Sequence, residues 1–163
     1  MFSVRDAAPG DEPAPARILR RASLSNAGDR DALFAHPEAL TLPDEDVLAG
    51  GRTLVATSAD GTVVGFARTR PTDRGVFELD DLFVDPDAMG RGVARRLILR
   101  IVTEAASEDV VRIGVTANCH ARGFYRAVGF VTGAPVDTEF ESAQRMHLDV
   151  ATTVRAHAPT DPS

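Results

Sequence analysis

Residues 82–97 read Leu-Phe-Val-Asp-Pro-Asp-Ala-Met-Gly-Arg-Gly-Val-Ala-Arg-Arg-Leu. The apolar stretch before them ends at Asp85-Pro86, because the residue before a proline is biased away from helix and proline donates no hydrogen bond to a sheet. After the two glycines, apolar side chains recur at spacings of three and four, the period of one helix face. The stretch therefore predicts a strand over 75–84, a glycine-containing turn, and a helix from about residue 90 to 106.

The turn, Met89-Gly90-Arg91-Gly92-Val93-Ala94, has the features of an anion-binding site. Glycine lets the backbone approach a ligand closely, and the first N–H groups of a helix are unpaired donors at the positive end of its dipole. Phosphate or pyrophosphate is the usual ligand of such a turn, and Arg95 and Arg96 add positive charge nearby. From the turn alone, a phosphate site and a purely geometric use of the glycines remain alternatives.

The two commonest nucleotide-binding loops do not fit this turn. A P-loop requires a lysine, and all 18 basic residues of the chain are arginines. The dinucleotide fingerprint requires a small residue where Arg95 stands and an acidic residue at the far end of the next strand, whereas Asp109 precedes a strand. Dinucleotide binding is therefore disfavoured.

The rest of the chain alternates strands and helices in an order that predicts an α/β fold. A hairpin with an Asp-Gly turn comes first and a strand–helix–strand–helix–strand order follows, which predicts a mixed sheet with helices on both faces. The other predicted strands cover residues 2–5, 53–58, 62–69, 110–116, 130–131 and 144–150, and the other predicted helices cover about 11–24, 32–34, 44–48 and 118–128.

Length and composition bound the class of protein. A chain of 163 residues with 44% hydrophobic and 26% charged residues is typical of one soluble globular domain. We expect that domain to cover residues 1–150, and a loose, flexible C-terminal tail over 151–163, where two prolines occur without an apolar period.

Several classes of partner are disfavoured by simple counts. One cysteine, Cys119, excludes an intramolecular disulfide, and no ligand-spaced cluster predicts a metal site. A net charge of −6 argues against a nucleic-acid partner, which requires a basic face. No apolar run is long enough to span a membrane, and the N-terminus lacks a signal-peptide pattern, so we expect a cytoplasmic protein.

A second motif reads Asn118-Cys-His-Ala-Arg-Gly-Phe-Tyr-Arg-Ala-Val-Gly-Phe130. Together with Leu82–Pro86 and the glycine turn, it resembles the GNAT superfamily of acyl-CoA N-acyltransferases, whose second segment is Asn-x-x-Ala-x-x-Phe-Tyr-x-x-x-Gly-Phe. The resemblance runs from about residue 2 to 150 and is sharpest over 78–130. It implies a mixed, mostly antiparallel sheet of six to seven strands. The family turn usually opens with Gln or Arg, and Met89 departs from this.

The resemblance implies that acetyl-CoA is the co-substrate. The backbone of the turn and the side chains of Arg91 and Arg95 are then expected to hold its phosphates, with Arg122 as a further cation. The N–H groups of Phe83 and Val84 are expected to polarise the thioester carbonyl and to pair with the pantetheine arm. Asn118 is expected to bind the pantetheine amide or to cap a helix, and one role does not exclude the other.

The resemblance also implies catalytic residues for attack by a primary amine on the thioester. Tyr125, the only tyrosine, is the candidate general acid; the alternative is a core aromatic beside Phe124. Glu78 is the candidate general base, with Asp80 or a water as alternatives, because alternation places Glu78 and Asp80 on one strand face with Leu82 and Val84. The alternative to a general-base role is that these carboxylates only make the site attractive to a cation.

The acceptor is not encoded by any motif that we can interpret. The acidic net charge favours a cationic amine, such as a polyamine, an amino sugar or a lysine side chain. A catalytically silent acyl-CoA-binding sensor or regulatory module is the alternative function. Cys119 is interpreted as a small packing residue, because no matched His and Asp accompany it as they would a nucleophile. The strand at Gln144–Val150 is the candidate edge for a homodimer.

Overall fold

The computed structural model describes residues 1–25, 30–35, 37–48, 51–73, 75–137 and 142–157. The chain forms two compact units. The first unit contains Met1–Arg70 and Asp80–Ile98, and the second contains Pro71–Leu79 and Leu99–Ser163. Strand β4 (Val76–Val84) and helix α4 (Val93–Ser107) each pass from one unit to the other.

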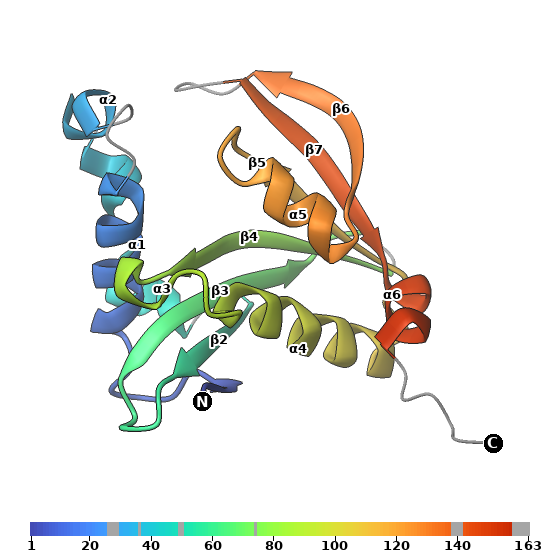
Figure 1. Cartoon of the computed structure of the whole chain (residues 1–163), viewed down its shortest axis with the longest axis horizontal. Helices are drawn as coiled ribbons and strands as arrows, with labels where there is room; N and C mark the ends of the chain where they lie inside the picture. The colour runs from blue at the N-terminus through green and yellow to red at the C-terminus, as the bar shows by residue number, and fades with distance from the viewer. Residues whose placement is uncertain (26–29, 36, 49–50, 74, 138–141, 158–163) are drawn as a thin grey trace. The chain divides into compact units, whose positions relative to one another are not determined.

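The strands form a seven-stranded sheet in the order β1-β2-β3-β4-β5-β7-β6 (Figure 1). The pair β4–β5 is parallel, whereas β1–β2, β2–β3, β5–β7 and β6–β7 are antiparallel. This confirms the predicted mixed, mostly antiparallel sheet of an α/β fold. The strands other than β4 are β1 (Ser3–Asp6), β2 (Arg52–Thr57), β3 (Val63–Pro71), β5 (Arg112–Ala117), β6 (Val131–Asp137) and β7 (Ser142–Asp149).

The edges of this sheet are β1 and β6. An edge strand at residues 2–5 is confirmed, since β1 pairs with β2 alone in the sheet order. The expected dimer edge at Gln144–Val150 is wrong, because residues 144–149 belong to β7, which lies between β5 and β6, and Val150 begins a helix. Hydrogen bonds to both neighbours occupy the strand, so it has no free edge to offer a second copy.

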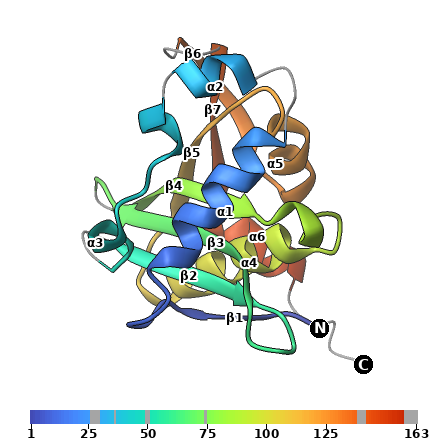
Figure 2. The same cartoon turned by 90° about the vertical axis from the view of Figure 1, so that its left-hand side faces the viewer.

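In the first unit, helix α1 (Pro13–Leu24) begins with prolines in its first turn, where their missing N–H groups cost nothing. Its apolar stripe, including Ile18 and Leu19, packs in one cluster with Phe66 of β3. The neighbouring Gly65 points to the opposite face, because a Cβ there would lie 2.9 Å from Val93 Cγ1 in the first turn of α4. Helices on both faces of this part of the sheet are therefore confirmed (Figure 2).

The first unit also contains short helical segments between α1 and β2 and after β4. They are α2 (Arg30–Ala35), η2 (Pro37–Leu40), α3 (Asp44–Val47) and η3 (Pro86–Ala88). The short helices predicted at 32–34 and 44–48 are therefore confirmed to within a few residues.

In the second unit, alternate residues of the strands are buried on one face, among them Leu79, Val115 and Met146. The opposite face carries Glu78, Gly114 and Arg145. Helix α5 (Arg122–Val128) begins four residues later than predicted, because Asn118–Ala121 form a turn instead of a helical segment.

The second unit contains a helix where the sequence predicts a loose tail. Helix α6 (Val150–His157) begins directly after β7, where the Asp149 side chain accepts a hydrogen bond from the Thr152 N–H at 2.8 Å. Val150 and Thr153 are buried. The predicted loose tail is therefore wrong for residues 151–157, since capping and two buried side chains hold a helix there. Residues 158–163 lie outside the described part of the chain.

Candidate functional site

The glycine turn lies in the first unit, between η3 and α4. Gly90 and Gly92 have φ of 76° and 83°, a conformation that other residues rarely adopt, and a Cβ at either would meet nothing within 4 Å. The Arg96 N–H donates to the Gly92 carbonyl at 3.1 Å and so forms the first bond of the helix. The N–H groups of the preceding turn, from Val93 to Arg95, therefore have no helical carbonyl to bind. Backbone conformation and open space together fit an anion cradle.

The residues beside the turn anchor it to α1. The Asp85 carboxylate is buried and accepts a hydrogen bond from the Asp87 N–H at 3.0 Å. It also forms an ion pair with Arg21, whose Nη1 lies 2.9 Å away. Arg21 Nη2 also contacts Asp87 at 3.1 Å. Asp85-Pro86 marks the end of β4 in the sequence, but nothing in the sequence identifies Arg21 as its partner. Met89 is half exposed, with 48% of its surface accessible.

The end of β4 carries the two residues expected to bind the thioester. The Phe83 ring stacks on Phe66 with centroids 5.8 Å apart, and Val84 is buried. Within the second unit, the parallel register of β4 with β5 extends from Val76–Arg112 to Leu79–Val115. β5 continues beyond this point, and its last two residues have β7 as their partner in the described registers. Such an end to strand pairing is what the predicted role of the Phe83 and Val84 N–H groups requires.

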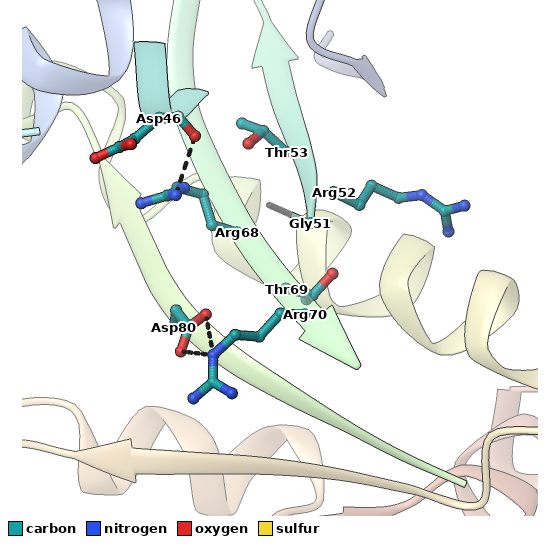
Figure 3. Close-up of a pocket in the computed structure, with 8 residues that line it drawn as sticks. All are labelled: Asp46, Gly51, Arg52, Thr53, Arg68, Thr69, Arg70 and Asp80. Carbon is teal, nitrogen blue, oxygen red and sulfur yellow. Dashed lines mark hydrogen bonds and ion pairs between the residues drawn. The ribbon is translucent and has the colours of Figure 1, made fainter. Parts of the chain in front are cut away.

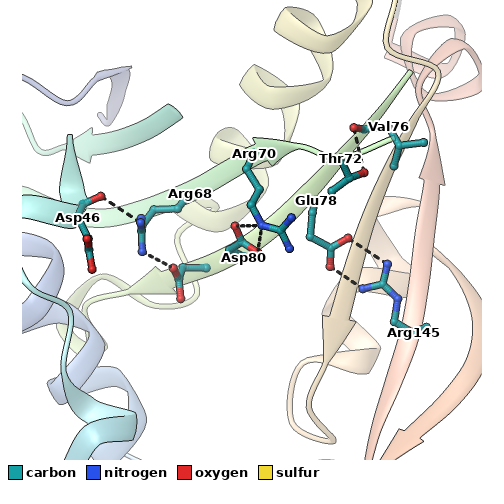
Figure 4. A network of polar contacts seen from close by, with 9 residues as sticks. Asp46, Arg68, Arg70, Thr72, Val76, Glu78, Asp80 and Arg145 are labelled. Carbon is teal, nitrogen blue, oxygen red and sulfur yellow. Dashed lines mark hydrogen bonds and ion pairs between the residues drawn. The ribbon is translucent and has the colours of Figure 1, made fainter. Parts of the chain in front are cut away.

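The alternation of side chains breaks in β4 at Asp80 and Asp81. Arg68 and Arg70 share one face of β3, and they bind these two consecutive aspartates: Arg68 Nη1 lies 3.2 Å from Asp81, and Arg70 Nε lies 2.9 Å from Asp80 (Figure 4). Consecutive residues of a regular strand point to opposite faces, so the strand has an irregularity here. The prediction that Leu82 and Val84 share a face with Asp80 is therefore wrong.

Asp81 is the carboxylate of this pair that the sequence reading missed. Burial is the largest influence on it and raises the pKa of the Asp81 carboxyl; the nearby Arg68 charge opposes the shift and the Asp80 charge adds to it. A buried carboxylate with a single arginine contact is thus disfavoured in its charged form.

Glu78, the candidate base, lies in the second unit and binds Arg145 through both carboxylate oxygens. Arg145 Nη1 lies 2.5 Å from Oε1 and Nη2 lies 3.0 Å from Oε2 (Figure 4). Nη1 also donates to the Thr116 hydroxyl at 2.9 Å. Hydrogen bonding to Glu78 raises the pKa of the Arg145 guanidinium. Two parallel charge-assisted bonds fix the position and orientation of the carboxylate.

Gly114 makes room for this ion pair. It lies beside Glu78 in the register of β4 and β5, and a Cβ there would lie 2.9 Å from Glu78 Oε2 and 2.8 Å from Arg145 Nη2. Arg145 reaches the pair from β7, where it is opposite Thr116. The sequence reading missed Arg145, because 67 residues separate it from Glu78 and only strand register brings the two together.

Tyr125, the candidate acid, is buried in the second unit. Its ring makes edge contacts with Phe124 and Phe130, with centroids 5.4 and 5.1 Å away. Only 6% of its surface is exposed, and Phe124 is less buried than Tyr125. Tyr125 is therefore a core residue of this unit, which leaves its hydroxyl as the group whose role is predicted.

The turn before α5 contains the other predicted residues of this motif. Asn118 Oδ1 accepts a hydrogen bond from the Ala121 N–H at 2.9 Å, within the turn before α5. The N-cap residue of α5 is Ala121 and no side chain caps it, so the predicted helix-capping role of Asn118 is wrong, and its pantetheine role stays a prediction. Arg122 is half-buried at the start of α5. Cys119 is exposed, so its interpretation as a packing residue is wrong.

Two features are absent from the described residues, a metal-binding cluster and a membrane-spanning helix. They contain no group of three or more His, Cys, Asp or Glu side chains that could hold a metal ion. Among the same residues, no helix has the length and apolar character needed to cross a lipid bilayer.

This chain is similar to known acetyltransferases. The model of the acetyltransferase (GNAT) family matches residues 21–130. Phosphinothricin N-acetyltransferase of Alcaligenes faecalis is 30% identical over 93 residues, which cover 52% of this chain and 47% of the relative. N-alpha-acetyltransferase RimI of Mycobacterium tuberculosis is 40% identical over 83 residues, which cover 47% of this chain and 50% of the relative. The chain thus matches about half the length of these curated relatives.

Solved structures show the same fold. The PaiA N-acetyltransferase of Thermoplasma acidophilum, solved in complex with coenzyme A, superposes with a TM-score of 0.74. The alignment covers 91% of this chain and 99% of that one, at 18% identity. At that identity the likeness concerns the fold and not the substrate.

Proposed function

Because the chain belongs to the GNAT acetyltransferase family, we propose that it is an N-acetyltransferase that uses acetyl-CoA and a primary amine. Residues 1–150 act as one acyltransferase domain, and the acetyl group moves by direct attack in a ternary complex. The observation that carries the proposal is the glycine turn before α4, whose two glycines have positive φ and open space beside them.

Several segments of the chain supply the residues that we propose hold acetyl-CoA. Backbone N–H groups from Arg91 to Ala94 bind the pyrophosphate at the N-terminus of α4, where the helix dipole favours an anion. Arg91, Arg95 and Arg122 contribute side-chain charge, and Asn118 contributes its amide to the pantetheine arm. The N–H groups of Phe83 and Val84 polarise the thioester carbonyl, which stabilises the charge that develops on its oxygen.

Two side chains handle the protons. Glu78, held in position by Arg145, accepts a proton from the acceptor ammonium directly or through one water. The amine nitrogen then bonds to the acetyl carbon, and the bond from that carbon to sulfur breaks. Tyr125 donates its phenolic proton to the departing thiolate, which leaves as the free thiol of CoA. The second proton that the nitrogen loses as the amide forms returns to the Tyr125 phenolate through water. No covalent acyl-enzyme forms, and Cys119 takes no part.

The first experiment is a thermal melt with and without acetyl-CoA. Saturation at about one hundred times the dissociation constant stabilises the native state by about 2.7 kcal/mol, which raises the Tm of a domain of this size by roughly 5–10 °C. Gly92→Glu should abolish the shift, because its carboxylate occupies the anion site. Gly10→Glu is the matched control, since Gly10 also has a positive φ and open space beside it. A wild-type protein free of CoA that shows no shift contradicts the proposal.

The second experiment measures release of the CoA thiol with a panel of amines. The chain has no lysine, so thiol release does not arise from its own side-chain amines. Tyr125→Phe keeps the ring contacts with Phe124 and Phe130 and removes only the hydroxyl. We expect turnover to fall by about 10²-fold while the acetyl-CoA shift is unchanged. Unchanged turnover rules out Tyr125 as the acid.

A further inference from the structure

The first unit contains a cavity of about 280 Å³ whose lining has no apolar side chain (Figure 3). It lies between α3, the start of β2, the end of β3, and β4. Five of its eight lining residues are charged and two are threonines; the lining consists of Asp46, Gly51, Arg52, Thr53, Arg68, Thr69, Arg70 and Asp80. Such a cavity suits a small, highly polar molecule, because an apolar one would desolvate these charges without replacing their hydrogen bonds.

The two arginines of β3 use their donors differently. Arg68 is committed through both terminal nitrogens, with Nη1 on Asp81 at 3.2 Å and Nη2 on the Asp46 carbonyl at 3.0 Å. Arg70 binds Asp80 through Nε, which lies 3.1 and 2.9 Å from the two carboxylate oxygens. Among the described residues, the contacts of Arg70 involve Nε alone. Its two terminal nitrogens are thus the donors that can receive a ligand.

The mixed charge of the lining discriminates between ligand classes. A simple anion would meet the Arg70 guanidinium but also the Asp80 carboxylate beside it. A polyamine would meet Asp80 but also three arginines. A molecule that carries a carboxylate and an ammonium two bonds apart satisfies both partners at once. The molecule must also be small, since pockets for drug-sized ligands have volumes of about 300–1,000 Å³.

We propose that this cavity binds the acceptor, and that the acceptor is a free α-amino acid or a close analogue. The α-carboxylate binds the terminal nitrogens of Arg70, and the α-ammonium binds the Asp80 carboxylate before it loses its proton. This inference rests on the proposed acetyltransferase function and narrows its acceptor. It excludes a polyamine, a lysine side chain and a protein N-terminus, because none of them has a carboxylate beside the reacting amine.

The test compares amino acids with the same molecules lacking the carboxylate. Ornithine is paired with putrescine, tyrosine with tyramine and histidine with histamine, within a panel of the twenty protein amino acids. We expect at least one amino acid to have a kcat/KM at least 10-fold above that of its decarboxylated amine. Arg70→Gln should raise the KM for that amino acid about 10-fold and remove most of its kcat/KM advantage over the decarboxylated amine. Equal use of both members of every pair overturns the proposal.

A control and a binding measurement separate this inference from the proposed function. Arg100→Gln is the matched control, because Arg100 is also an exposed, ion-paired arginine, bound to Glu104 on α4, and it does not line the cavity. Thermal melts with each amino acid in the presence of CoA report acceptor binding without turnover. An amino-acid shift that Arg70→Gln removes supports the site even if no thiol is released, in which case the transferase proposal fails alone. No shift with any amino acid and preferred turnover of plain amines overturn the site alone.

Discussion

Glu78 and Asp81 are both carboxylates of β4 with an arginine partner, and they differ in how that partner is held. Arg145 engages both oxygens of Glu78, at 2.5 and 3.0 Å, and Gly114 leaves the space that the pair needs. Arg68 donates to Asp81 through Nη1 alone, at 3.2 Å. Its other terminal nitrogen donates to the backbone carbonyl of Asp46. Burial accordingly raises the pKa of Asp81 despite its arginine. The geometry of an ion pair, and not only the presence of a partner, decides how firmly a carboxylate is held in place.

The largest effect should come from breaking the Glu78 arrangement through its neighbour. Gly114→Ala places a methyl group 2.8 Å from Arg145 Nη2 and 2.9 Å from Glu78 Oε2, so the ends of these two side chains must shift and their pairing geometry changes. We expect kcat to fall by about 10²-fold, the contribution of a general base, and stability to fall by about 1–3 kcal/mol. Steady-state kinetics and urea unfolding measure the two effects.

Gly123→Ala is the control for this substitution. Gly123 lies in α5 and a Cβ there would meet nothing within 4 Å, so alanine should stabilise the helix by about 0.5–1 kcal/mol and leave kcat unchanged. If Gly114→Ala lowers stability but not kcat, the pair is structural and Glu78 is not the base.

This comparison also separates what the sequence could predict from what it could not. The glycine turn can be predicted from the sequence because its determinants, from Asp85-Pro86 to the period of α4, are contiguous. The role of Arg145 cannot be predicted, because its partner Glu78 lies 67 residues away and the contact depends on the register of β5 with β7. Residue alternation likewise fails at Asp80, because a local strand irregularity reverses the faces that follow it. Local physics thus predicts the loop, and tertiary register places the acid–base partners.

A third carboxylate, Asp85 at the end of β4, sharpens the comparison with a smaller effect. It is buried and combines one arginine contact with a hydrogen bond from the Asp87 N–H. Arg21→Gln removes the contact to Arg21 Nη1 and loosens the segment before the glycine turn. We expect the dissociation constant of acetyl-CoA to rise about 5-fold, equivalent to about 1 kcal/mol, with kcat unchanged at saturation.

Isothermal titration with acetyl-CoA measures this change. Arg20→Gln, an exposed position on the same helix, is the control and should leave the affinity as it is. An unchanged affinity in Arg21→Gln would show that Asp85 and its backbone hydrogen bond suffice to hold the turn.

The smallest effect concerns the pH dependence of stability at Asp81. Because burial raises the pKa of Asp81 in the folded state, the native protein binds its proton more tightly than the unfolded chain. The resulting stability is fully present below the ordinary aspartate pKa of about 3.9 and is lost as the pH rises through the folded-state value. Asp81→Asn removes this loss. The free energy of unfolding of the variant, measured with urea, should therefore rise relative to that of the wild type between pH 4 and pH 7.

Asp11 provides the control of opposite sign for Asp81. Its hydrogen bond from Arg5 lowers the pKa of the Asp11 carboxyl, so its stabilising contribution is present at neutral pH and lost as the pH falls through the folded-state value. Asp11→Asn should therefore be less stable than the wild type throughout pH 4–7, and the deficit should shrink only below about pH 4. If Asp81→Asn does not gain stability relative to the wild type between pH 4 and pH 7, or the Asp11→Asn deficit does not shrink below pH 4, the opposite pKa directions of these two carboxylates are wrong.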